Sequence, residues 1–256
     1  MNEHVDLQRD GPVATILLNR PDAYNALNEK MRLKLAQAIA EVEADAALRV
    51  VVVAGAGRGF CAGADIKAPS TKTAGEVLEQ EFRPCLAPIW NSDKIYISAV
   101  HGHAAGIGAA IALACDLVVM EETAKVTLAF AAIGLVPDGG LCWHLTRALG
   151  SRRALEAIVE GQSLDAAICA KTGLANRIAD PGDALARAQN WAATIADAAP
   201  MAVLAAKRLV SQSGRMEISD LFSCEAKEQT CLAQSKDHDR GVAAFLGRKT
   251  PVFKGN

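Results

Sequence analysis

Four consecutive valines, Val50 to Val53, constrain the fold of this chain more than any other feature. A continuous apolar run that ends in a glycine-rich stretch, here residues 55–59, is typical of a strand covered on both faces. A second strand pattern at residues 96–100 is followed in the same way by glycines and then by a helix of small residues, 107–115. Together the two units predict an α/β fold.

Other segments fit this organisation. A β-rich run at residues 13–18 ends in a turn, and Asn28 is placed to cap a helix over 29–44. Further strands are expected at 116–120 and 126–130. After Leu141 the chain becomes mostly helical, with helices predicted at 141–149, 152–160, 164–172, 181–198 and 201–211. Because proline disfavours a helical residue before it, Pro200 marks the boundary between a core of residues 1–199 and a helical segment, 200–256.

Composition excludes several classes of function. The net charge is −2, and aromatic residues make up only 4% of the chain, so neither a field that attracts nucleic acid nor base-stacking platforms are expected. Seven cysteines, an odd number without a C-x-x-C pair, argue against a disulfide framework. The first residues carry no basic start followed by an apolar run, and the most apolar stretch, 104–120, is too interrupted to span a bilayer. We therefore expect a cytoplasmic protein that binds neither nucleic acid nor membrane.

Two glycine-bearing segments are the candidates for chemistry. Residues 60–67 follow the valine strand, and residues 103–110 lie between the second strand and its helix. Small residues let a backbone approach a ligand, and N–H groups at a turn or helix start can face an anion. Close packing of helix against sheet would also require small residues, so each segment alone remains ambiguous. A dinucleotide site is not predicted, since neither segment gives a clean G-x-G-x-x-G. Together the two segments predict an oxyanion hole.

At these segments the sequence resembles the crotonase (enoyl-CoA hydratase/isomerase) superfamily, and the likeness runs through nearly the whole chain in the family's order. The matching segments are Asn19-Arg20-Pro21, Asn25-Ala26-Leu27, residues 59–67, Ala105-Gly106-Ile107-Gly108, Ala114-Cys115-Asp116, residues 133–140, Arg152-Arg153-Ala154, Gly173-Leu174 and residues 241–246. The resemblance implies a crotonase-like spiral of ββα units followed by a helical C-terminal trimerisation segment. It also implies a homotrimer or homohexamer that binds an acyl-CoA thioester.

The resemblance assigns roles to particular residues. The N–H groups of Ala64 and Ile107 are expected to hold the thioester oxygen, and no cofactor is expected, because coenzyme A is part of the substrate. The residues expected to bind the coenzyme A portion are Ala62, Asp65, Ile66, Lys67, Phe245 and Arg248.

The catalytic carboxylates set this chain apart from the family's hydratases. Those enzymes use two glutamates, and the matching positions here are Ala110 and Phe130, neither of which can carry a proton. Asp138 remains as a candidate base, although an aspartate before Gly139-Gly140 and a helix can also serve as an N-cap. An apolar lining from Phe130, Ile133 and Trp143 is expected to raise its pKa. His103 and His144 could each titrate near neutrality, but no triad or metal-ligand spacing supports either as a base, and a packing role is favoured for both.

The predicted function is that of an acyl-CoA enzyme that stabilises a thioester enolate. A 3-enoyl/2-enoyl-CoA isomerase, in which one aspartate shuttles one proton, suits a site with a single carboxylate. Alternatives on the same scaffold are an enoyl-CoA hydratase, an aryl-CoA dehalogenase or an acyl-CoA hydrolase. A catalytically silent CoA-binding relative is the non-enzymatic alternative.

Overall fold

A mostly parallel sheet organises the N-terminal part of the protein in the computed structural model, which describes residues 4–68 and 71–256. Its strand order is β1-β2-β3-β4-β6-β9, with β1 antiparallel to β2 and the other neighbours parallel. Its strands are β1 (His4–Asp10), β2 (Val13–Asn19), β3 (Val50–Gly55), β4 (Ile95–Val100), β6 (Leu117–Glu121) and β9 (Arg177–Ala179). The valine run lies on β3 at the centre of this sheet and is buried, as predicted.

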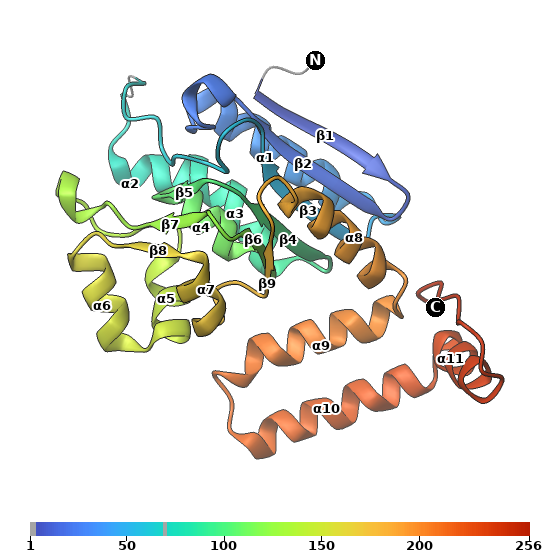
Figure 1. Cartoon of the computed structure of the whole chain (residues 1–256). Coiled ribbons are helices and arrows are strands. Elements are labelled where there is room, and N and C mark those ends of the chain that lie inside the picture. The colour runs from blue at the N-terminus through green and yellow to red at the C-terminus, as the bar shows by residue number, and fades with distance from the viewer. Residues whose placement is uncertain (1–3, 69–70) are drawn as a thin grey trace. The chain divides into compact units, whose positions relative to one another are not determined.

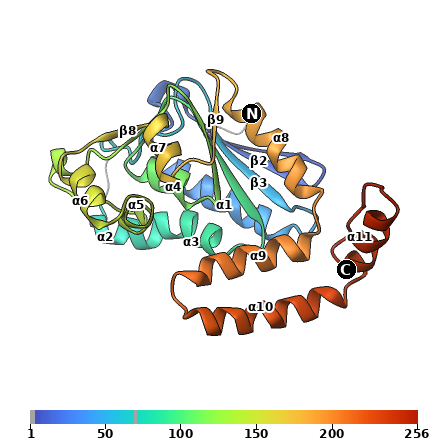
Figure 2. The ribbon, with the colours of Figure 1, turned by 60° about the horizontal axis from the view of Figure 1, so that its bottom comes forward.

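Helices cover both faces of this sheet. Helix α1 (Glu29–Ala44) packs against β1 and β2, and its buried stripe includes Met31, Leu35 and Ile39. The side chain of Asn28 accepts a hydrogen bond from the Met31 N–H, which confirms the predicted cap. Helix α8 (Ala184–Ala196) lies on the opposite face (Figure 2). Its Gln189 side chain donates a hydrogen bond to the Thr15 hydroxyl on β2. The alternation of side chains along a strand explains why Thr15 faces α8 and the next residue faces α1.

A small second sheet lies beside the large one (Figure 1). It consists of β5 (His103–Ala105), β7 (Lys125–Thr127) and β8 (Ser163–Asp165), with β5 parallel and β8 antiparallel to β7. The sequence predicted only a glycine-bearing connection between the strand at 96–100 and the helix at 107–115, so β5 was missed. The predicted strand at 126–130 is also shorter, since the chain leaves the sheet after Thr127. Both strands are three residues long and have little pattern of their own.

Further helical segments complete the N-terminal unit. They are η1 (Pro21–Ala23), α2 (Ala74–Val77), the π-helix η2 (Leu78–Phe82), α3 (Arg83–Asn91), α4 (Ile107–Ala114), η3 (Ala131–Ile133), α5 (Leu141–Leu149), α6 (Ser151–Val159) and α7 (Ala166–Thr172). The chain divides into two compact units, Met1–Ala192 and Ala193–Asn256. The second contains α9 (Pro200–Ser213), α10 (Ile218–Ala233) and α11 (Lys236–Leu246). Within the described residues, none of the helices has the length and apolar character needed to cross a bilayer.

One buried side chain joins the loops that follow β2 and β3. Asn25 is fully buried and has a left-handed backbone, with φ of 57°. Its Nδ2 lies 2.9 Å from the Ala56 carbonyl oxygen, 2.8 Å from that of Gly59 and 3.1 Å from that of Phe60. Its Oδ1 accepts from the Arg20 N–H at 2.8 Å. The amide therefore satisfies carbonyls that would otherwise be buried without donors.

We expect Asn25→Asp to lower the free energy of unfolding by about 3 kcal/mol or more, because it replaces a buried donor with an anionic oxygen that faces carbonyls. Urea denaturation measures this loss. Asn28→Asp is the matched control, since an aspartate caps a helix as well as an asparagine does. Equal stability of the two variants would contradict the role assigned to Asn25.

Candidate active site

The first amide of the candidate site belongs to Ala64. Leu27 pairs with Ala64 as in a parallel sheet: the Leu27 N–H donates to the Gly63 oxygen at 2.8 Å, and the Asp65 N–H donates to the Leu27 oxygen at 3.2 Å. In this pairing the residue between the two bonded neighbours directs its own N–H away from the partner. Ala64 is exposed, and its N–H has no backbone acceptor within the described residues. It is therefore available to a ligand.

The second amide belongs to Ile107, the first residue of α4. Gly106 precedes it with φ of 53° and ψ of −130°, a conformation that favours glycine, and no side chain caps the helix. The Gly106 N–H donates to the Thr127 oxygen at 3.2 Å, whereas the Ile107 N–H has no backbone acceptor in the described ranges. A first-turn N–H lacks a partner within its helix and lies at the positive end of the helix dipole.

Backbone contact places these two segments side by side. The Ala105 N–H donates to the Cys61 oxygen at 2.9 Å. A Cβ atom on Gly63 would lie 2.8 Å from the Ala105 oxygen, and one on Gly108 would lie 2.4 Å from the Cys61 oxygen. Both distances are shorter than van der Waals contact, so only glycine permits this approach. The small residues therefore serve close packing and the exposure of the amides at once, and the two interpretations of the sequence do not exclude each other.

Asp138 lies next to the first turn of α4. A Cβ on the following residue, Gly139, would lie 2.6 Å from Ile107 Cδ1, 2.5 Å from Ala110 Cβ and 3.2 Å from Leu86 Cδ1. Gly139 has φ of 59°, in the left-handed region. The loop that carries the candidate base is thus packed directly against the helix that carries the second amide.

One oxygen of the Asp138 carboxylate has no hydrogen-bond partner among the described residues. This atom, Oδ1, is buried. Burial raises the pKa of Asp138 to about 6, against a lowering by its own backbone N–H. The helix that follows, α5, has Gly140 as its N-cap and no side-chain cap. The N-cap interpretation of Asp138 is therefore wrong, since this side chain does not bond the helix start.

The two histidines occupy different surroundings. His103 is exposed on β5. Burial lowers the pKa of His144 to about 4, with a smaller contribution from the nearby charge of Arg147, and its ring makes an edge contact with Trp143. His144 is consequently neutral at pH 7, and packing accounts for its position.

Residues predicted at the coenzyme A end lie at or near the first amide. Asp65 forms an ion pair with Arg20 at 2.7 Å, and this hydrogen bond lowers the pKa of its carboxyl group. Ala62, Ile66 and Lys67 are exposed around the same turn, with Ile66 80% exposed. Their contact with a ligand stays a prediction.

The predicted apolar lining divides into two parts. Phe130 is buried, and its Cζ would lie 3.8 Å from a Cβ on Gly106, so it borders the second amide segment. Ile133 and Trp143 are 57% and 45% exposed, and their part in a pocket stays a prediction. The Arg147 guanidinium stacks 3.8 Å from the centre of the Trp143 ring.

Two apolar residues on α3, which pack beside Gly139 and Gly140 and so form a wall next to Asp138, were not predicted from the sequence. Leu86 Cδ1 lies beside Gly139, and Trp90 Cζ2 would lie 3.5 Å from a Cβ on Gly140. The spacing of Phe82, Leu86 and Ile89, three and four residues apart, was an available signal for a helix with one buried face.

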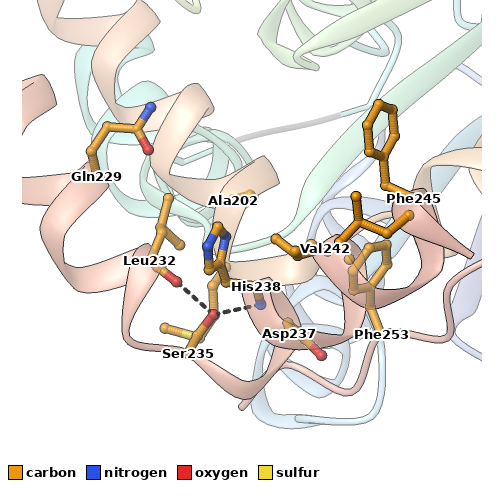
Figure 3. A pocket seen from close by; sticks show the side chains of 13 residues that line it. Ala202, Gln229, Leu232, Ser235, Asp237, His238, Val242, Phe245 and Phe253 are labelled. Carbon is orange, nitrogen blue, oxygen red and sulfur yellow. Dashed lines mark hydrogen bonds between the residues drawn. The ribbon is translucent and has the colours of Figure 1, made fainter.

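The C-terminal unit contains a hollow of its own, with a volume of about 420 Å³ (Figure 3). Phe245, 82% exposed overall, lines it together with Val242 and Phe253. Asp237 also borders it. Burial alone would raise the pKa of Asp237, but the backbone N–H groups of residues 254 and 255 and the Arg240 guanidinium together lower it. This carboxylate is thus engaged in holding the chain end.

The C-terminal unit also carries Arg248, the last of the residues predicted to bind coenzyme A. Arg248 follows α11 with φ of 51°, and its binding to coenzyme A stays a prediction, as does that of Phe245. Assembly into trimers or hexamers stays a prediction too.

Within residues 4–68 and 71–256, no three His, Cys, Asp or Glu side chains are grouped to hold a metal ion.

Two unbonded amides on adjoining segments and one buried carboxylate define a site suited to an anionic carbonyl oxygen and a proton transfer. The family model for enoyl-CoA hydratase/isomerase matches residues 8–256. The chain therefore belongs to the enoyl-CoA hydratase/isomerase family, whose members act on acyl-CoA thioesters, and its crotonase-type fold agrees with the predicted one.

Similar proteins carry more than one activity in their names. The chain is 32% identical over 249 residues to 1,2-epoxyphenylacetyl-CoA isomerase of Escherichia coli (strain K12), covering 95% of each sequence. It is also 32% identical over 249 residues to 2,3-dehydroadipyl-CoA hydratase of the same strain, covering 97% of this chain and 98% of the relative. A crystal structure of an enoyl-CoA hydratase from Polaromonas sp. JS666 superimposes with a TM-score of 0.91 at 31% identity, covering 98% of this chain and all of the other.

The raised pKa of Asp138 gives a prediction about stability. Between about pH 4 and 6 the folded protein binds more protons at this site than the unfolded chain, so stability falls as pH rises through that range and stays lower above it. Asp138→Asn removes the cost of a buried charge. We expect its Tm to exceed that of the wild type at pH 8, with the difference shrinking towards pH 4, as thermal denaturation at both pH values would measure. An equal difference at both pH values would contradict the assignment.

Proposed function

We propose that this protein is an enoyl-CoA isomerase that interconverts 3-enoyl-CoA and 2-enoyl-CoA, with Asp138 as its only acid–base group. The observation that carries the proposal is the buried Asp138 oxygen without a hydrogen-bond partner, on a carboxyl group whose pKa is raised to about 6. A carboxyl group with this pKa is deprotonated at neutral pH and can return a proton readily.

The electron flow needs one base and one oxyanion site. Asp138 removes a proton from C2, and the electrons of the C2–H bond move into a dienolate whose oxygen accepts from the N–H groups of Ala64 and Ile107. The protonated Asp138 then returns the proton at C4, so the double bond moves from C3–C4 to C2–C3. No other atom enters or leaves, and a second carboxylate is not needed.

The residues around Asp138 support this reaction over hydration. Ala110 and Phe130 stand where the resemblance to the family's hydratases places two glutamates, and both are buried. A hydratase needs groups that orient and deprotonate water, whereas the wall of Leu86, Ile107 and Ala110 beside Gly139 is apolar. The relatives' names include both activities, so the proposal depends on these local features.

Asp138→Ala should lower kcat for isomerisation about 10²–10⁴-fold, the range that general acid–base catalysis contributes, because this site has a single proton shuttle. Binding of acyl-CoA should persist. The measurement is turnover of 2-enoyl-, 3-enoyl- and aromatic acyl-CoA esters in D₂O. Deuterium at C4 of a 2-enoyl product, or at C2 of a 3-enoyl product, marks the carbon that is reprotonated, and isomerisation without deuterium marks direct return of the abstracted proton. A product heavier by one water would show hydration instead, and full turnover by the variant would exclude Asp138 as the base.

Ile107→Pro tests the second amide. Proline is well accepted at the first position of a helix, so the variant should keep α4 while it lacks the N–H. We expect kcat to fall about 10²–10³-fold. Ile107→Ala is the control, because it removes the side chain that packs on Gly139 but keeps the donor. If both variants lost the same activity, packing rather than the amide would account for the effect.

A further inference from the structure

A buried arginine outside the site connects the two parts of the chain that form it. Arg32, on the first turn of α1, has a side chain only 8% exposed. Its Nε donates to Glu81 Oε2 at 2.6 Å, and its Nη2 lies 2.5 Å from the same oxygen. Its Nη1 donates to the Leu27 carbonyl oxygen at 2.7 Å. The guanidinium also lies over the Phe82 ring, 5.2 Å from its centre.

Leu27 is the residue whose backbone holds the first amide segment. Its carbonyl oxygen accepts both from Arg32 and from the Asp65 N–H, and its own N–H donates to Gly63. Ala64 lies between those two bonded neighbours. A displacement of the Leu27 carbonyl would therefore displace the Ala64 N–H.

Glu81 is the link to the other half of the site. It lies on the π-helix η2, which continues directly into α3. Helix α3 supplies Leu86 and Trp90, which pack against Gly139 and Gly140 beside Asp138. Lys72 holds the second oxygen of Glu81 at 2.8 Å, and hydrogen bonding to Lys72, then to Arg32, lowers the pKa of Glu81 against the effect of burial.

We propose that Arg32 is a positioning residue for the oxyanion site. Its guanidinium fixes the Leu27 carbonyl, and hence the Ala64 N–H, relative to the helical segment η2–α3, which carries Glu81 and packs against the loop of Asp138. The proposal rests on the proposed function of that site. An arginine fork can bond two acceptors in a fixed geometry, whereas a lysine supplies a point charge on a flexible stem.

A purely structural ion pair would behave differently. Replacing both members of a buried pair by apolar residues of similar size often restores stability. Such a replacement cannot restore the hydrogen bond to the Leu27 oxygen. Stability and positioning are therefore separable in the double variant Arg32→Met/Glu81→Met.

The test compares this double variant, Arg32→Lys and Glu79→Gln with the wild type. Glu79 forms an exposed pair with Arg83 on the same segment and is the matched control. The probe is acetoacetyl-CoA, whose enolate absorbs in the near ultraviolet, so a spectral titration of the bound compound reports how well the site stabilises an oxyanion. Thermal denaturation and steady-state kinetics of the isomerisation, with kcat and KM determined separately, complete the comparison.

We expect the double variant to melt near the wild-type Tm but to ionise bound acetoacetyl-CoA at least tenfold less favourably, with kcat reduced at least tenfold and KM little changed, because small misplacements of catalytic groups are costly. Arg32→Lys should show the same enolate defect if the double variant does not fold. Glu79→Gln should match the wild type. Wild-type enolate stabilisation in both Arg32 variants would overturn the proposal. A wild-type protein that stabilises the enolate but isomerises no enoyl-CoA would contradict only the proposed reaction.

Discussion

Direct backbone contact between residues 61–64 and 104–108 is the constraint on which the rest of the site depends. Glycine at positions 63 and 108 lets carbonyl oxygens approach to distances that any side chain would prevent. The large sheet supplies the strands that deliver both segments to one place, and the small sheet anchors the second one through β5 and β7. Because the donors are main-chain groups, their chemistry depends on the path of the chain rather than on side-chain identity.

In contrast to the two main-chain donors, the candidate base is a side chain, and the fold keeps the Asp138 carboxylate in unfavourable surroundings. A buried oxygen without a donor lowers the stability of the folded state, and the same burial gives the group a pKa suited to proton transfer. The surrounding packing must hold it there. Gly139 and Gly140 contribute through contacts with α3, α4 and α5, so the loop is restrained from several directions.

The sequence allowed the strands β2, β3, β4 and β6, the first helix and the glycine-bearing segments that follow β3 and β4 to be predicted, because each carries a strong local pattern, whereas β1 and β9 were not predicted. The valine run and the Asn28 cap are examples, and the family resemblance connected them. The strand β5 could not be predicted, since three residues pair with a partner distant in the sequence. The part of the wall formed by α3 was missed although Phe82, Leu86 and Ile89 have helical spacing, because that spacing does not tell which segment the buried face meets. Contacts such as that of Leu86 with Gly139 depend on tertiary packing alone.

The tight fit of Gly139 on α4 also limits how such enzymes can exchange reactions during evolution. A glutamate introduced at position 110 would start from a Cβ atom already in contact range of Gly139, on a helix residue that is completely buried. Its longer side chain would compete for space with the 137–140 loop, whose Gly139 packs against this position. Acquisition of a second carboxylate is thus coupled to the path of the loop, so position 110 and residues 137–140 are expected to change together.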